Sequence, residues 1–306
     1  MTALPAPPAP RRRRPPESAA HSAIKLGTRT SPLALAQATL VATAIVGEVE
    51  VVGLSTSGDR DDGPEEDKRR WVDRIEEALG SGEIDLAVHS AKDVPSALAP
   101  GLEIAGAPAR ADARDALCGA PSLAALRPGA RVGTSSLRRS AQLRALREDI
   151  EVVALHGNVG TRLRRLDEGE FDAIVLACAG LSRLGLDAGV ALEEMIPAVG
   201  QGTLALEARS GDVRVAAAIA ALRDTATERA LHAERALAGA LGASCRTPIG
   251  AHAKPLSDGS LELRVFVGRA DGSSWVRDSQ RGSEPVALGE TLAERLRSAG
   301  VAELLA

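Results

Sequence analysis

Aromatic side chains are almost absent from this chain of 306 residues, which contains two Trp, two Phe and no Tyr. Proteins that bind single-stranded nucleic acid stack the bases on aromatic rings, so the composition argues against RRM-like and OB-type binders. The core must instead be built from Ala, Leu, Val and Ile. With 44% apolar and 25% charged residues, the chain is neither fibrous, collagen-like nor wholly disordered. Its length is sufficient for two or three packed domains.

Long apolar runs are also missing. The longest, at residues 173–181 and 215–222, are much shorter than the ~20 residues that span a bilayer, so we expect no membrane association. The three cysteines, Cys118, Cys178 and Cys245, form no CxxC pair and are odd in number. This pattern indicates neither a disulfide framework nor a metal site.

The charge balance lacks the basic excess of a nucleic-acid-binding protein, because 37 basic and 41 acidic side chains give a net charge of -4. Four consecutive arginines occur at residues 11–14, but no apolar run follows them, so a secretory signal is not indicated. We interpret residues 1–22 as a disordered Pro/Arg tail and expect a cytoplasmic protein. Binding of this tail to nucleic acid or an anionic surface is the alternative to a solvated extension.

A short apolar run, a turn of small residues and a helical pattern recur from Ile24 onward, which is typical of βα units and a mostly parallel sheet. In the first unit, an apolar run at residues 24–26 leads into a turn in which Ser31 and Pro32 suit the start of a helix. Further turns follow residues 85–89, 131–132 and 152–155. Ligands bind at the carboxyl ends of strands in such sheets, so these turns are the expected site.

The pattern predicts an α/β fold with two lobes and a third small α+β domain. Residues 121–129 suggest a boundary between the first and the second lobe, and the second lobe ends at a Gly/Pro-rich return at residues 197–202. A charged run at residues 59–70 predicts a mobile loop. The elements expected in the third domain are a long helix at 225–241, a half-buried strand at 261–267 and a closing helix at 286–298.

Basic residues concentrate between Arg131 and Arg165, where eight arginines and three acidic residues give a net charge of +5. The dipole of a helix N-terminus disfavours cations, so arginines in the first helical turn favour a bound anion. The guanidinium fork suits carboxylates and phosphates. No GxGxxG or Walker sequence is present, so small anions are favoured over nucleotides. Arginines of the expected anion site are Arg29, Arg138, Arg139 and Arg162, whereas Arg144, Arg147, Arg164 and Arg165 suit a solvated helix face.

Two further residues have the chemistry of a reactive site. Asp93 lies in a turn after a strand, where a carboxylate can act as general acid/base or stabilise a cation, although a turn-capping role is the alternative. A triad of His89, Ser90 and Asp93 is disfavoured because neighbouring side chains of a strand point to opposite faces. Cys245 lies in a small-residue loop beside an arginine, which lowers a thiol pKa, whereas Cys118 and Cys178 read as apolar fillers.

Seven ordered motifs between about Ile24 and Ala253 resemble the porphobilinogen deaminase, or hydroxymethylbilane synthase, family. They are GTRTSPLAL at 27–35, DLAVHSAKDVP at 85–95, GTSSLRR at 133–139, GNVGTR at 157–162, AGLSRLG at 179–185, PAVGQG at 197–202 and the Cys245 loop. The resemblance implies two lobes like those of periplasmic binding proteins, with the active cleft between them. It also implies domains at 23–113 plus 203–222, at 114–202 and at 223–306.

The resemblance further implies a transferase that deaminates four porphobilinogen molecules and condenses them into hydroxymethylbilane in tetrapyrrole biosynthesis. The growing chain would be built on a dipyrromethane cofactor attached to Cys245, and Asp93 would protonate the leaving ammonia and stabilise the resulting cation. Each ring has an acetate and a propionate, which arginines can neutralise. The implied cofactor contacts are Lys92, Asp93, Thr134, Ser136, Arg138 and Arg139, and the implied substrate contacts are Arg29, Ser31, His156, Arg162, Arg183 and Gln201. The family also implies a monomer.

Three positions depart from the family's usual pattern. His156 replaces an arginine, so one carboxylate contact is expected to depend on pH. In the charged loop, we expect Trp71 to substitute for the aromatic residue that the family usually has, and Lys68 to substitute for its usual lysine. Ala243 and Ser244 replace the two glycines that usually precede the cysteine in the family, and this narrows the backbone conformations allowed there.

Two other functions stay open on the residues alone. A non-catalytic, two-lobed binder of small dicarboxylates or oxyanions would keep the arginines and be stabilised by its ligand, but would leave Cys245 unmodified. Nucleic-acid binding through residues 1–22 would show steep salt dependence and would be lost with the tail.

Overall fold

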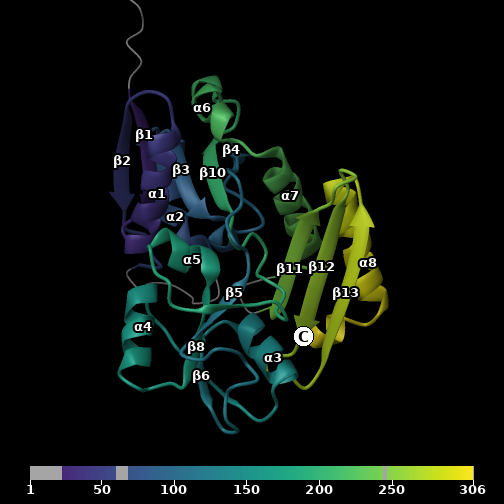
Figure 1. Ribbon diagram of the computed structural model, residues 1–306. Coiled ribbons are helices and arrows are strands. Elements are labelled where there is room, and N and C mark those ends of the chain that lie inside the picture. Colours follow the sequence, from purple (N-terminus) through teal and green to yellow (C-terminus); the bar gives the residue numbers. More distant parts are fainter. Residues whose placement is uncertain (1–22, 60–67, 244–246, 306) are drawn as a thin grey trace, which may run out of the picture.

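The computed structural model describes residues 23–59, 68–243 and 247–305. Two five-stranded sheets and one three-stranded sheet form the framework. Figure 1 shows the two larger sheets one above the other, as two lobes, with the small sheet beside them. This arrangement confirms the predicted fold class. The N-terminal tail, Cys245 and most of the charged run lie outside the described residues.

The first lobe is a mostly parallel sheet with strand order β2-β1-β3-β10-β4. The strands β1, β2 and β3 are parallel, whereas β10 returns from the second lobe and runs antiparallel to β3 and β4. Helices α1 and α2 pack against this sheet. The bounds are β1 Ile24–Arg29, α1 Pro32–Ala44, β2 Val49–Leu54, α2 Asp73–Ser81, β3 Leu86–Ser90, β4 Leu102–Gly106 and β10 Leu204–Arg209.

The first βα unit has the predicted helix start. Ser31 caps α1 by accepting a hydrogen bond from the Ala34 amide at 3.3 Å, and Pro32 occupies the first turn. The preceding strand is longer than predicted and continues to Arg29, because residues 27–29 pair in register with β2. The strand therefore ends with Arg29 at the carboxyl edge of the sheet.

The second lobe has strand order β7-β6-β8-β5-β9. A boundary at residues 121–129 is wrong, because β5 precedes this segment and already pairs with β8 of the second sheet. Residues 121–129 instead connect β5 to β6 within one lobe. The bounds are β5 Asp115–Cys118, β6 Arg131–Gly133, α3 Leu137–Leu146, β7 Glu151–Val153, α4 Val159–Asp167, β8 Ala173–Ala177, α5 Cys178–Arg183 and β9 Val190–Leu192.

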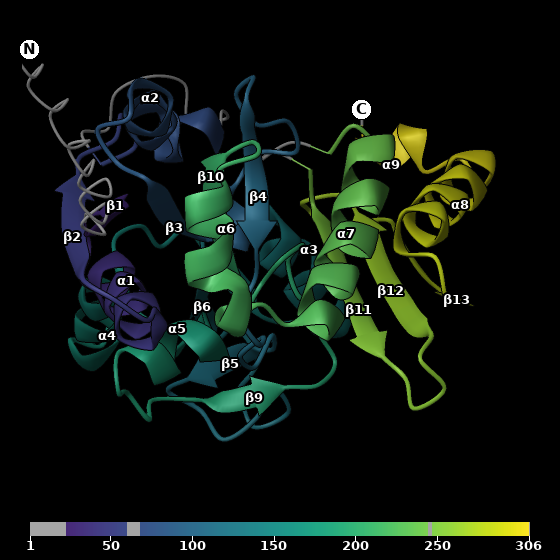
Figure 2. The ribbon, with the colours of Figure 1, turned by 90° about the horizontal axis from the view of Figure 1, so that it is seen from above.

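A third unit follows after α6 (Val213–Ile219). Its antiparallel sheet packs with α7 and α8 around a core that includes Leu237, Leu263 and Leu292. The predicted long helix is present but ends one residue earlier, and Figures 1 and 2 both show it between the first lobe and the small sheet. The bounds are α7 Thr225–Ala240, β11 Ile249–Pro255, β12 Leu261–Gly268, β13 Trp275–Gly282, α8 Pro285–Ser298 and α9 Ala302–Leu305.

The lobes are joined by two segments, one containing Ala111 and the other Gly202, which pack closely against each other. The Ala111 amide donates to the Gly202 carbonyl at 3.1 Å, and Gly202 has a φ of 85°. A Cβ on Gly202 would lie 2.5 Å from the Ala111 oxygen, so a larger residue cannot fit. In the described part of the chain, no helix has the length and apolar character needed to cross a bilayer.

Candidate active site

The Lys92-Asp93 turn occupies the carboxyl edge of the first-lobe sheet, as the sequence predicted. A 3-10 turn at Ala91–Asp93 follows β3, and the Ala91 amide donates to the Thr203 carbonyl at 3.0 Å. Asp93 lines two cavities, one within the first lobe and one between the lobes. Asp93 is thus shared by the linings of both cavities.

The first-lobe cavity has a volume of about 60 Å³ and is lined by residues that include Arg29, Ser31, Trp71, His89, Ser90 and Asp93. Arg29 pairs with Asp59, with Nε 3.1 Å from Oδ1, and its guanidinium lies 4.3 Å from the centre of the Trp71 ring. Burial opposes ionisation of Asp59, but hydrogen bonds from Arg29 and Thr56 lower its pKa. The predicted ligand arginine therefore has a carboxylate partner within the chain.

The interlobe cavity has a volume of about 350 Å³. Ser136 begins α3 as its N-cap and accepts from the Arg139 amide at 3.4 Å, while Thr134 accepts from the Ser136 amide at 3.2 Å. These two hydroxyls therefore organise the turn. The Ser135 hydroxyl oxygen is buried without a hydrogen-bond partner in the described part of the chain. The residues that line the interlobe cavity include Lys92, Asp93, Ser135, Ser136, Arg138, Arg139, Arg162, Gln201 and Thr247.

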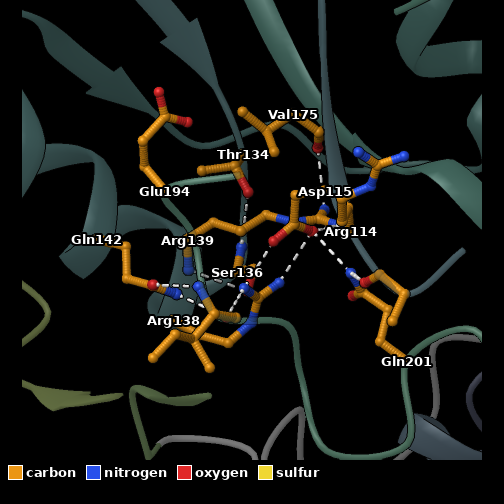
Figure 3. Close-up of polar contacts among 12 residues, drawn as sticks. Arg114, Asp115, Thr134, Ser136, Arg138, Arg139, Gln142, Val175, Glu194 and Gln201 are labelled. Atoms are coloured by element: carbon orange, nitrogen blue, oxygen red, sulfur yellow. Dashed lines mark hydrogen bonds and ion pairs between the residues drawn. The ribbon is translucent and has the colours of Figure 1, made fainter. Parts of the chain in front are cut away.

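Asp115 lies at the centre of the arginine cluster (Figure 3). Its Oδ2 accepts from Arg138 at 2.7 Å, and its Oδ1 accepts from Arg139 at 2.9 Å and from Gln201 at 3.0 Å. Burial of Asp115 would raise its pKa, but the charges of Arg138 and Arg139 hold it well below the usual range. The anion expected between these arginines is thus a carboxylate of the chain itself, and the sequence pattern did not predict it.

Two other arginines of the site have no carboxylate partner in the described residues. Arg162 donates from Nε to the Gly157 carbonyl at 2.7 Å, and Arg183 donates to the Gly202 carbonyl at 2.7 Å. Burial lowers the pKa of both groups, that of Arg183 to about 10. Both line an inner cavity of about 80 Å³, together with Lys92, Arg139 and Gln201. Their remaining donors are suited to carboxylates of a ligand.

The remaining arginines are largely surface groups. Ion pairs join Arg147 to Asp149, Arg164 to Glu168 and Arg165 to Glu170. The interpretation as a solvated face is wrong for Arg144 and Arg147, which are both half-buried. Arg144 donates to the Ala270 carbonyl of the third unit, and Arg147 donates to the Leu123 and Leu126 carbonyls as well as pairing with Asp149. His156 is exposed, directly before Gly157 with its φ of 110°.

His89, Ser90 and Asp93 do not form a triad, as predicted. His89 points to Glu207, with Nε2 2.9 Å from Oε2, and the Ser90 hydroxyl accepts from Gln37 at 2.9 Å. Burial raises the pKa of the Cys118 and Cys178 thiols to about 11, so neither is a thiolate near neutral pH.

The chemistry of the site is that of a cationic cleft with one carboxylate on its lining, because Asp59 and Asp115 are bound to arginines behind it. Among the described residues that line the three cavities, Asp93 is the only acidic group. Three or more metal-ligating side chains gather nowhere in residues 23–59, 68–243 and 247–305. Thr247 and Ile249, which follow Cys245 in the chain, line the interlobe cavity. The site is suited to a ligand that has several carboxylates and develops positive charge as it reacts.

Comparison with known proteins gives one family. Residues 24–217 match the family model described as "Porphobilinogen deaminase, dipyromethane cofactor binding domain", and residues 229–298 match "Porphobilinogen deaminase, C-terminal domain". The chain is 49% identical to a porphobilinogen deaminase of Roseiflexus sp. (strain RS-1), covering 92% of this chain and 98% of that protein. It is 46% identical to one from Rubrobacter xylanophilus, covering 92% and 95%.

Similar solved structures include the methionine binding protein MetQ, which is 16% identical with a TM-score of 0.43 and covers 68% of this chain and 93% of that one. An ABC transporter periplasmic substrate-binding protein from Coxiella burnetii is 15% identical with a TM-score of 0.39, covering 67% and 94%.

Proposed function

Because this chain belongs to the porphobilinogen deaminase family, we propose roles for its own residues in the reaction of that family. Enzymes of the family release ammonia from four porphobilinogen molecules and condense them into hydroxymethylbilane, in tetrapyrrole biosynthesis. The matched region is the dipyrromethane cofactor-binding domain. When bound, that cofactor supplies the pyrrole carbon to which the first substrate is joined.

Cys245 holds the cofactor in this proposal, and the interlobe cavity receives it. Thr247 lines that cavity, which supports a short path from the cysteine to the arginine cluster. The Ser135 hydroxyl, which has no hydrogen-bond partner among the described residues, and the cationic side chains that line the cavity fit a group with several carboxylates. The residues proposed to hold it are Lys92, Asp93, Thr134, Ser136, Arg138 and Arg139.

We propose that Arg162 and Arg183 hold most of the substrate carboxylates, because each guanidinium has N–H donors beyond the one bonded to a carbonyl of the chain. Arg29 binds a substrate carboxylate with the guanidinium edge that Asp59 does not use, since Asp59 occupies Nε and one terminal nitrogen. Ser31, His156 and Gln201 complete the proposed substrate contacts. Each carboxylate neutralised in this way lowers the repulsion between successive rings.

Asp93 is the proposed general acid. It donates a proton to the aminomethyl nitrogen of porphobilinogen, the C–N bond breaks, and ammonia leaves. The carboxylate that results stabilises the cationic methylene-pyrrolenine. A C–C bond then forms to the neighbouring pyrrole carbon, whose proton passes to the Asp93 carboxylate, so that the acid is restored for the next addition. The observation that carries this proposal is that Asp93 is the only carboxylate of a described residue to line these cavities, and that it lines two of them.

Replacing Asp93 by Asn tests the role directly. We expect turnover to fall by roughly 10²- to 10⁴-fold, as for loss of a general acid, with the thermal midpoint unchanged because the side chain is not part of the core. The product is measured as uroporphyrin after closure and oxidation of hydroxymethylbilane. A wild-type rate in Asp93→Asn would exclude the general-acid role.

Intact-protein mass spectrometry tests the attachment at Cys245. The purified chain should exceed its calculated mass by two linked pyrrole units, and Cys245→Ser should not. An unmodified mass after incubation with porphobilinogen would favour the dicarboxylate binder instead. In that case, replacing Ala243 and Ser244 by glycine would show whether these residues prevent attachment.

The finer assignments complete the proposal. We propose that the enzyme is a cytoplasmic monomer that does not bind nucleic acid, with domains at 23–113 plus 203–222, at 114–202 and at 223–306. The net charge of -4 and the ion pairs of the surface arginines support the absence of a nucleic-acid site. Light scattering and DNA titration at low salt, with and without residues 1–22, check the oligomeric state and the tail.

A further inference from the structure

One face of α7 contacts the segment that follows the Lys92-Asp93 turn. Val94 belongs to a small apolar cluster with Ala91, Ala205 and Leu231, the last of which lies on α7. Arg235 is one helical turn after Leu231, so the two side chains share a face of the helix. The third unit therefore provides both an apolar and a polar contact to this segment.

The guanidinium of Arg235 holds three successive carbonyls. It donates to the oxygens of Val94 at 3.5 Å, Pro95 at 2.8 Å and Ser96 at 3.0 Å. These residues immediately follow Asp93, the last residue of the 3-10 turn. A planar fork that binds several oxygens fixes the path of the backbone more strictly than a single bond does.

A buried pair of a carboxylate and an imidazole lies next to the same arginine. Glu207 on β10 and His89 on β3 are 3% or less exposed in their side chains and 2.9 Å apart. Burial lowers the pKa of Arg235, and the nearby Glu207 carboxylate opposes that shift. The strand β3 that leads into the Asp93 turn, the returning strand β10 and α7 thus contribute His89, Glu207 and Arg235 to one cluster of titratable side chains.

We propose that Arg235 is a positioning residue that sets the location of the Asp93 carboxylate from the third unit. The inference rests on the proposed role of Asp93 as general acid. Arg235 acts by fixing the three carbonyls after Asp93, while Glu207 balances its charge inside the protein. The unit proposed to carry the cofactor cysteine thereby also orients the acid that acts on the substrate.

A matched control lies on the same helix. Arg229 also donates to two carbonyls, those of Gly259 at 2.8 Å and Ser283 at 2.6 Å, but both belong to the third unit. Arg229→Gln removes the same kind of contact without touching the Asp93 turn. A difference between the two variants therefore reports position and not the general loss of an arginine.

The experiment compares Arg235→Gln, Arg235→Lys and Arg229→Gln in the full-length holoenzyme. We expect Arg235→Gln to lower kcat by about 10- to 100-fold, the cost of misplacing a catalytic group by about an ångström, with KM changed less than about 3-fold. Arg235→Lys should recover part of the rate, and it also serves if the glutamine variant does not fold. Arg229→Gln should keep kcat within about 2-fold, the spread expected of a surface change.

A double-mutant cycle separates positioning from general stability. When Asp93 is already replaced by Glu, Arg235→Gln should cost much less than in the wild type, because both changes misplace the same carboxylate. Full multiplication of the two losses, or a kcat for Arg235→Gln equal to that of Arg229→Gln, would overturn the inference. Near-wild-type turnover in Asp93→Asn would instead refute the general-acid role itself, so the two failures are distinguishable.

Discussion

At the scale of single residues, Asp115 determines how the arginine cluster can exist inside the protein. Two guanidinium groups that are only 5% and 6% exposed need a compensating charge, because burying an unpaired ion costs several kcal/mol. Asp115 compensates one positive charge and orients both side chains. One net positive charge remains on the three groups for a ligand.

Replacing Asp115 by Asn should lower the free energy of unfolding by about 3 to 5 kcal/mol, because two buried cations lose their partner. Urea unfolding measures the effect. The control is Glu168→Gln, which breaks the exposed pair with Arg164 and should cost less than about 1 kcal/mol. Equal losses in the two variants would contradict a structural role for Asp115.

The pH dependence of stability should identify the same carboxylate. The pKa of Asp115 is lower in the folded than in the unfolded protein, so its contribution is complete above the unfolded value of 3.8. The contribution is lost as pH falls below that value towards the folded pKa. Wild type and Asp115→Asn should therefore converge in stability on acidification, and a constant difference down to pH 2 would refute this assignment.

Trp71 should affect binding of the substrate through Arg29. Its ring lies against the guanidinium, a contact worth about 0.5 to 2 kcal/mol, so Trp71→Leu should raise KM by about 2- to 30-fold. Trp71→Phe retains an aromatic face and should lose less. Trp275→Phe, in the small sheet, is the control. An unchanged KM in Trp71→Leu would show that the ring does not orient Arg29.

At the scale of the elements, local signals in the sequence predicted the start of α1 and the two long helices of the third unit, α7 and α8. The start of α1 was predictable because Ser31 and Pro32 are themselves the cap and the first turn. The strand pairings were not, because the antiparallel return of β10 and the placement of β5 depend on residues far apart in the chain. The same holds for the sites, since Asp59 and Asp115 are distant from the arginines they bind. A single acid heading the apolar run at 116–118 was the available signal for Asp115.

The segment that returns from the second lobe should tolerate no side chain at Gly200. Its φ is 72°, and a Cβ would lie 2.9 Å from the Ala91 Cβ and 3.1 Å from the Lys92 amide nitrogen. Gly200→Ala should therefore displace the Asp93 turn and lower kcat. Gly211→Ala is the control, because its φ is 76° but a Cβ there meets no atom within 4 Å.

We expect both glycine variants to lose about 1 to 2 kcal/mol from the left-handed backbone conformation alone. Only Gly200→Ala should also lose turnover, measured as uroporphyrin formed at saturating porphobilinogen. Equal turnover in the two variants would show that the contact between Gly200 and Ala91 does not affect the catalytic turn.

At the scale of the whole molecule, Glu234 on α7 joins the three units. Its Oε1 accepts from Arg110 at 2.6 Å and from the Ala253 amide of β11 at 2.8 Å, and its Oε2 accepts from the Gly200 amide at 2.7 Å. Arg110 and Gly200 lie on the two segments that cross between the lobes. Since this carboxylate is fully buried, its bonds are shielded from water and are expected to couple the unfolding of the units.

Glu234→Gln should uncouple the third unit from the lobes. The two tryptophans of the chain report on different parts, because Trp71 lies in the first lobe and Trp275 in β13. In single-tryptophan forms that retain one or the other, urea unfolding should give coincident midpoints for the wild-type background, as a cooperative molecule requires. With Glu234→Gln, the two midpoints should separate.

The control is Glu262→Gln, which removes a carboxylate bound to Arg264 and Arg281 entirely within the small sheet. Both arginines of these two ion pairs are largely exposed, so the change should cost less than about 1 kcal/mol and leave the midpoints coincident. Coincident midpoints in Glu234→Gln as well would mean that apolar packing between α7 and the lobes is sufficient for coupling. Separation in Glu234→Gln alone would assign the coupling to one buried carboxylate, because that group bridges both interlobe segments and the small sheet.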